Sequence, residues 1–188
     1  MVKTLDHYQP ALVIRLTSAN ITRIIAVFEQ IVTNSAMKFS ESERRILRAL
    51  QQNGRTSNVE LAQKVGLSES PCFRRVKQLE DTGVISNYAA IVDQRKLGLD
   101  VTAFVQVTLD QRSEPDTEAF LRAVELEDNI MECYATSGDY DFLLRVVAKN
   151  IDDFADISMR RILKFPGVKN IVSTFSLQTV KLSHVLPT

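Results

Sequence analysis

Residues 57–83 read SNVELAQKVGLSESPCFRRVKQLEDTG and predict two short helices separated by a tight turn. Ser57 and Glu60 fit the S-x-x-E capping box, in which the hydroxyl and the carboxylate each satisfy a free backbone N–H at a helix start. The first helix is expected over about 57–65 and ends at Gly66, which can take the left-handed conformation of a helix C-terminus. A short turn with a glycine between two helices is typical of a helix-turn-helix.

The second helix of this stretch carries its own boundary signals. It begins at Ser68 or Ser70, because Pro71 suits a first helical turn, and it stops before Gly83. The residues that follow, VISNYAAIVD (84–93), are β-prone and are broken by a Ser-Asn pair, which predicts a small hairpin or wing. The expected fold of this part is therefore a winged helix-turn-helix.

One further helix precedes these two. In MKFSESERRILRAL (37–50), Ser40 and Glu43 form another S-x-x-E capping box. The apolar side chains of this helix share a face opposite its arginines: Ile46, Leu47 and Leu50. The sequence thus predicts three short helices before the wing.

Residues 69–82, wound as a helix, separate into two faces. The apolar face holds Cys72, Val76 and Leu79 and is expected to dock on the other two helices, with Cys72 as a small core residue. The outward face is mostly basic or polar and consists of Ser70, Arg74, Lys77, Gln78 and Asp81. Because the major groove of DNA accepts a helix, this face predicts DNA contact, to phosphates or to bases. The alternative is a basic face that is merely solvated.

Charge is distributed unevenly along the chain, although 23 Lys and Arg balance 23 Asp and Glu. Residues 44–79 carry eight basic and two acidic side chains, whereas residues 110–160 carry five basic and thirteen acidic ones. A basic part and an acidic part in one chain predict two different tasks.

The two cysteines, Cys72 and Cys133, have no spacing typical of a zinc site or a disulfide framework, so we expect no metal and no cofactor. A reducing cytoplasm is the expected location. Residues 11–32 are apolar, but charged residues interrupt them too often for a membrane span or a signal peptide.

The last part of the chain alternates strand and helix. Strands are expected at 102–109, 130–136, 142–148 and 168–182, with helices at about 115–126 and after Asn150, whose side chain caps the second one. The order β-α-β-β-α-β predicts a ferredoxin-like domain, an antiparallel sheet with two helices on one face. The other face carries Phe104 and further large residues, so we expect a second subunit to cover it.

These elements divide the chain into five parts. Residues 1–37 form an N-terminal extension with an amphipathic helix, and Met37 stands where a natural start would precede the capped helix. The other parts are the winged helix-turn-helix at 38–93, a linker at 94–101, the ferredoxin-like domain at 102–182, and a tail at 183–188.

With these motifs the chain resembles the Lrp/AsnC family of transcription regulators, also called feast/famine regulatory proteins. The resemblance rests on LRALQQNGRTSNVELAQKVGLSESPCFRRVKQLEDTGVI (47–85), CYATSGDYDFLLRV (133–146) and FPGV (165–168). It implies a regulator that binds double-stranded DNA, forms homodimers that assemble into octamers or similar rings, and responds to an amino acid or related metabolite bound between dimers. The N-terminal extension departs from the family pattern.

Two sets of candidate residues follow. The DNA-contacting set is Ser57, Asn58, Ser68, Ser70, Pro71, Arg74, Arg75, Lys77 and Gln78. Arg75 lies on the flank of its helix, where it either pairs with Glu80 or clamps a phosphate. The effector-binding set is Thr136, Ser137, Gly138, Asp139, Tyr140 and Asp141. In that turn the carboxylate of Asp139 or Asp141 can accept from the ammonium of an amino acid, and the backbone N–H at Gly138 can donate to its carboxylate. Gly and Asp are, however, also favoured where a turn simply closes a hairpin. Tyr140 can equally pack at a subunit contact.

Two rival functions remain open at this stage. Sirohaem decarboxylases have a related two-domain build, but the only histidines here, His7 and His184, lie outside both expected domains, and no nucleophile and base replace them. We therefore expect no catalytic residues and no enzyme. A metabolite sensor that has lost DNA binding is the other alternative.

Overall fold

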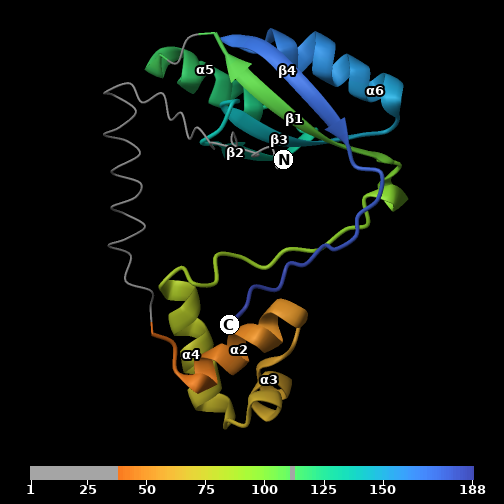
Figure 1. Cartoon of the computed structure of the whole chain (residues 1–188). Coiled ribbons are helices and arrows are strands. Elements are labelled where there is room, and N and C mark those ends of the chain that lie inside the picture. Colours follow the sequence, from red (N-terminus) through yellow and green to blue (C-terminus); the bar gives the residue numbers. More distant parts are fainter. Residues whose placement is uncertain (1–37, 111–112) are drawn as a thin grey trace, which may run out of the picture. The chain divides into compact units, whose positions relative to one another are not determined.

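The computed structural model describes residues 38–110 and 113–188, which form two compact units (Figure 1). The helical unit consists of residues 38–93 with residues 178–188, and the sheet unit consists of residues 94–177. The amphipathic helix expected in the N-terminal extension lies outside the described residues.

Three helices make up the helical unit: α2 (Glu41–Gln52), α3 (Asn58–Val65) and α4 (Glu69–Asp81). Both expected capping boxes are formed, because Ser40 and Ser57 each accept from the backbone N–H of the glutamate three residues later, and that glutamate accepts from the serine's own N–H. Gly66 ends α3 in the left-handed conformation, with φ of 68°. Ser68, not Ser70, is the N-cap of α4.

The core of the helical unit is apolar and draws on all three helices. Its buried side chains are Ile46, Leu47, Ala49, Leu61, Ala62, Val65, Cys72 and Leu79. Cys72 is fully buried, which confirms it as a small core residue and raises the pKa of its thiol. Burying a Leu or Ile side chain stabilises a fold by about 1.5–3 kcal/mol, so this cluster holds the three helices together.

Of the small hairpin or wing expected at 84–93, the hairpin does not form, since that segment contains no strand. Its contacts go back to α4 instead: the Ile85 N–H donates to the Leu79 carbonyl at 3.0 Å, and the Tyr88 hydroxyl donates to Glu80 at 3.0 Å. Burial and this hydrogen bond raise the pKa of Tyr88 to about 12. The segment therefore pairs with a helix, not with itself.

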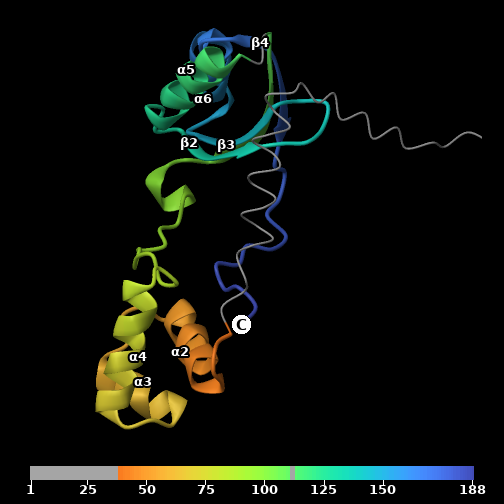
Figure 2. The ribbon, with the colours of Figure 1, turned by 90° about the vertical axis from the view of Figure 1, so that its left-hand side faces the viewer.

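The sheet unit contains β1 (Val101–Leu109), α5 (Glu114–Glu125), β2 (Ile130–Ala135), β3 (Phe142–Ala148), α6 (Ile151–Ala155) and β4 (Val168–Phe175), with a short helix η1 (Arg95–Leu97) before them. The strands form one antiparallel sheet in the order β2-β3-β1-β4. The helix begun by α6 continues through two irregular turns, η2 (Asp156–Arg161) and η3 (Ile162–Lys164). Figure 2 shows α5 and α6 on the same face of the sheet, which confirms the expected ferredoxin-like arrangement.

Register decides which side chains of the sheet are buried. Val105 lies opposite Leu144 and Val107 opposite Phe142, and all four face the helices. Phe120, Phe154 and Ile162 of the helical segments complete this core. The intervening residues point to the other face, where Phe104, Tyr134 and Val172 remain 39%, 54% and 51% exposed.

The last strand is shorter than expected. β4 ends at Phe175, opposite Ala103, whereas the sequence predicted a strand as far as residue 182. Its partner β1 begins at Val101, only two residues before Ala103, and the pairing ends where the Ser176 N–H donates to the Thr102 carbonyl. Residues 178–188 belong to the helical unit, where Gln51 of α2 binds Leu186 through both of its amide atoms.

Candidate functional site

One face of α4 presents polar and basic side chains to solvent. A shallow depression on this face is bordered by Phe73, Arg74, Lys77, Gln78, Asp81 and Thr82. The predicted contact residues Arg74, Lys77 and Gln78 are therefore together, while Cys72 and Leu79 point into the core, as the helical wheel predicted. A concave, positively charged strip on an exposed helix can lie against a phosphate backbone or against base edges.

Lys77 has an acidic neighbour on the same helix. Its ammonium lies 3.1 Å from the Asp81 carboxylate, and this hydrogen-bonded ion pair raises the pKa of Lys77. Both side chains are more than half exposed, so the pair contributes little to stability and solvent or another anion can replace it. Lys77 can therefore turn from Asp81 to a phosphate at small cost.

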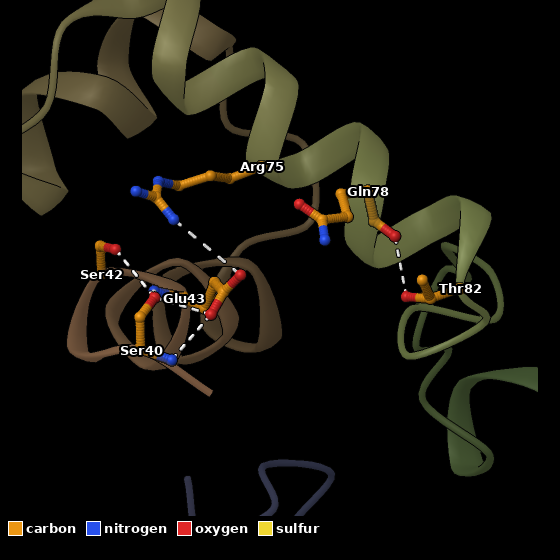
Figure 3. Close-up of polar contacts among 6 residues, drawn as sticks. All are labelled: Ser40, Ser42, Glu43, Arg75, Gln78 and Thr82. Carbon is orange, nitrogen blue, oxygen red and sulfur yellow. Dashed lines mark hydrogen bonds and ion pairs between the residues drawn. The ribbon is translucent and has the colours of Figure 1, made fainter. Parts of the chain in front are cut away.

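Arg75 points toward Glu43 at the start of α2 (Figure 3). Its Nη1 lies 3.9 Å from Oε1 of Glu43, so the expected pairing with Glu80 is wrong. The Nε atom of Arg75 is buried and has no hydrogen-bond partner among the residues that the structure describes. Arg75 therefore connects α4 to α2 through Glu43. Its alternative role as a phosphate clamp stays a prediction.

The Glu43 carboxylate interacts with both Ser40 and Arg75. Its Oε2 accepts hydrogen bonds from the Ser40 N–H at 2.7 Å and the Ser40 hydroxyl at 2.6 Å. These bonds, and secondarily the charge of Arg75, hold the pKa of Glu43 below its ordinary value. One carboxylate thus caps α2 and receives the guanidinium of α4.

The remaining predicted DNA contacts lie around the turn between α3 and α4. Ser57 is occupied as the cap of α3, and Asn58 donates from its amide nitrogen to the Glu69 carbonyl at 3.1 Å, which fastens α3 to the start of α4. Ser68 makes no capping hydrogen bond with its side chain, and both Ser68 and Ser70 are exposed. The hydroxyls at the start of α4 are therefore accessible.

Sequence reasoning missed Phe73. The helical wheel of 69–82 assigned Phe73 to neither face, but 61% of Phe73 is exposed, and it borders the same depression as Arg74. Phe73 stands four residues before Lys77, and residues at this spacing lie on the same side of a helix. This spacing could have placed Phe73 beside the basic face.

The predicted effector turn of the sheet unit is partly occupied by its own hydrogen bonds. The Thr136 hydroxyl donates to the Tyr140 carbonyl at 2.6 Å, and the Thr136 N–H donates to the Asp141 carbonyl at 2.9 Å. Asp141 Oδ2 accepts from the Leu109 N–H at 2.8 Å, which fastens the turn to the end of β1. Asp141 is therefore a structural residue in this conformation.

Ser137, Gly138 and Asp139 form the exposed tip of the same turn. A Cβ built on Gly138 would meet nothing within 4 Å, so the backbone there is open to a ligand. Of the two acidic residues considered for an ammonium contact, Asp139 is the accessible one.

No group of metal-ligating residues occurs among the described residues, and none of the helices in that part of the chain is long and apolar enough to cross a membrane.

Two family models match the chain. Residues 39–86 match a winged helix-turn-helix DNA-binding model, and residues 102–186 match the Lrp/AsnC ligand binding domain. The first match lies within the helical unit, and the second covers β1 to β4 of the sheet unit and continues to residue 186, into the segment that belongs to the helical unit.

Characterised relatives extend over most of the chain. The leucine-responsive regulatory protein of Escherichia coli K12 is 38% identical over 145 residues, which cover 77% of this chain and 88% of that protein. The transcriptional regulator AzlB of Bacillus subtilis is 31% identical over 147 residues, or 78% of this chain and 94% of the relative.

Solved structures agree with the fold. The L-Met complex of a transcriptional regulator from Neisseria meningitidis has a TM-score of 0.77 at 34% identity and covers 80% of this chain and 97% of its own. The AsnC protein of Escherichia coli has a TM-score of 0.71 at 28% identity and covers 77% and 96%.

Proposed function

Because the chain belongs to the Lrp/AsnC family of transcription regulators, we propose that α4 reads its target DNA and that an amino acid at the 136–141 turn modulates binding. The chain is a DNA-binding regulator with a ligand-binding domain, and it is not an enzyme. The decarboxylase alternative is thereby removed.

The exposed face of α4 is the observation that carries the DNA proposal. Arg74 and Lys77 border one depression with Gln78, on the helix that follows the glycine turn. In the complex, Arg74 contacts a base edge or a phosphate. Lys77 gives up its ion pair with Asp81 and binds a phosphate instead. Ser68 and Ser70, at the positive N-terminal end of α4, add donors to the backbone of the DNA.

The effector proposal rests on the tip of the turn at 137–139. Asp139 is an exposed carboxylate able to accept from the ammonium of an amino acid, and the open backbone at Gly138 is able to donate to its carboxylate. A methionine complex is known for the similar Neisseria meningitidis regulator, which supports an α-amino acid as the ligand class.

Assembly of the subunits is part of the proposal. The exposed sheet face presents Phe104, Tyr134 and Val172, large apolar residues of the kind that a homodimer interface buries. A homodimer through this face, with dimers assembling into octamers or similar rings, would bring turns of neighbouring dimers together around the amino acid.

A binding titration tests the DNA proposal. The purified chain is titrated on a fragment from upstream of its own gene and on a shuffled control, at two salt concentrations, with and without amino acids. We expect salt-sensitive binding that prefers the native fragment. Arg74→Ala should lose about 1–3 kcal/mol if Arg74 reads a base, and Lys77→Ala should lower the salt slope by about one.

Arg122→Ala is the matched control, because Arg122 is an exposed arginine of α5, in the sheet unit. Its binding should equal that of the wild type. Weak binding that is equal on both fragments and unaffected by Arg74→Ala would favour the alternative of a metabolite sensor that has lost DNA binding.

A further inference from the structure

Phe73 is the one large apolar side chain that borders the basic depression of α4. It is 61% exposed, whereas Cys72 before it is fully buried. Scattered exposed apolar residues are ordinary on protein surfaces. What distinguishes Phe73 is that its neighbours in the depression are Arg74, Lys77 and Gln78.

Helix geometry places the Phe73 side chain within the outward strip. At about 100° per residue, Phe73 and Lys77 differ by about 40° around the helix axis. Arg74 follows Phe73 in the chain and flanks Lys77 on the other side. A surface that fills this depression therefore contacts the ring of Phe73 as well as Arg74 and Lys77.

DNA offers one apolar group in the major groove. Phosphates and most base edges present charges, donors or acceptors, but thymine presents its C5 methyl group beside them. A phenyl ring beside cationic side chains would lose its hydration against a phosphate or a guanine edge and gain no apolar contact there. Against a thymine methyl it would bury apolar surface on both partners.

We propose that Phe73 reads the C5 methyl group of a thymine in the target site, and that it is a specificity-determining residue of α4. This inference rests on the proposed role of α4 in DNA recognition. It predicts a preference for thymine, and for 5-methylcytosine, over bases that lack the methyl group at one position of each half-site.

Deoxyuridine isolates this contact, because it pairs like thymine and lacks only the methyl group. The full chain first selects its preferred sequences from a duplex pool with a randomised centre. Each thymine of the selected site is then replaced singly by deoxyuridine, and the dissociation constants of wild type and Phe73→Ala are compared.

We expect one thymine per half-site whose replacement weakens wild-type binding about three- to fivefold, the loss typical of one buried methyl group. The same replacement should change binding by Phe73→Ala less than about 1.5-fold. Leu126→Ala, which alters an 86% exposed leucine next to α5, is the matched control and should keep full deoxyuridine sensitivity.

Three other outcomes would overturn the inference. If wild type tolerates deoxyuridine everywhere, or if Phe73→Ala keeps the wild-type sensitivity, DNA recognition by α4 stands without the methyl contact. If Phe73→Ala instead changes the oligomer mass and leaves deoxyuridine sensitivity intact, Phe73 is a contact between subunits. Failure of the wild type to select any sequence would reject the proposed function itself.

Discussion

Arg75 of α4 and Glu43 of α2 face each other at 3.9 Å, and the same Glu43 carboxylate holds the Ser40 N–H that begins α2. A single carboxylate thus caps one helix and contacts another. Because Arg75 precedes Lys77 by only two residues, whatever fixes Arg75 also limits the rotation of the proposed DNA-contacting face.

The first prediction concerns this pairing. Glu43→Gln and Arg75→Gln should each lower the free energy of unfolding, and the double variant should lose less than the sum, with a coupling of about 0.2–1 kcal/mol. The value is small because the Arg75 side chain is 36% exposed. Urea unfolding of the four proteins measures it, and strictly additive losses would show that the two residues do not interact in solution.

The second prediction is a loss of stability in acid. Hydrogen bonds from Ser40 and Ser57 lower the pKa of Glu43 and Glu60 from the ordinary value of 4.5. A depressed folded-state pKa contributes stability above that ordinary value, and this contribution disappears as the pH falls through the folded-state pKa.

Thermal unfolding between pH 6 and pH 3 checks this dependence. The unfolding temperature of the helical unit should decrease once the pH is below about 4.5. In the double variant Glu43→Gln and Glu60→Gln, this decrease should be smaller. An identical pH profile in the double variant would mean that other carboxylates cause it.

The third prediction concerns the chain after β4. Gln51 accepts from the Leu186 N–H at 2.6 Å and holds residues 178–188 on the helical unit. Gln51→Ala should make trypsin cleave faster after Lys181. Loss of a hydrogen bond worth about 0.5–1.5 kcal/mol raises the fraction of molecules in which residues 178–188 are detached by about two- to tenfold. Gln52→Ala, at the exposed neighbouring position, is the control and should be cleaved at the wild-type rate.

The fourth prediction separates the two acidic residues of the effector turn. Asp141→Ala removes the acceptor of the Leu109 N–H and should lower the free energy of unfolding by about 1–3 kcal/mol. Asp139→Ala should leave stability within about 0.5 kcal/mol of wild type, because Asp139 is exposed, and should weaken the response to a mixture of amino acids. An unaltered amino-acid titration of Asp139→Ala would remove Asp139 from the proposed site.

Much of the fold followed from signals that lie close together in the sequence. The capping boxes of Ser40 and Ser57 span four residues each, and both formed. The period-two pattern of 102–109 gave the buried face of β1, and the order of strands and helices gave the ferredoxin-like class. At 84–93 and after Phe175 the residues are also β-prone, but no neighbouring strand pairs with them there, and the expected strand did not form.

By itself, the sequence determined the helix starts, the buried stripe of α4 and the order of the sheet unit, because caps and periodicity act between residues a few positions apart. Tertiary structure alone decided that Arg75 meets Glu43, that Asp141 serves Leu109, 32 positions away, and that Gln51 holds Leu186, 135 positions away. Such pairs form only when packing of the hydrophobic cores brings distant segments together. Which polar residues remain accessible for function is therefore a property of the folded chain.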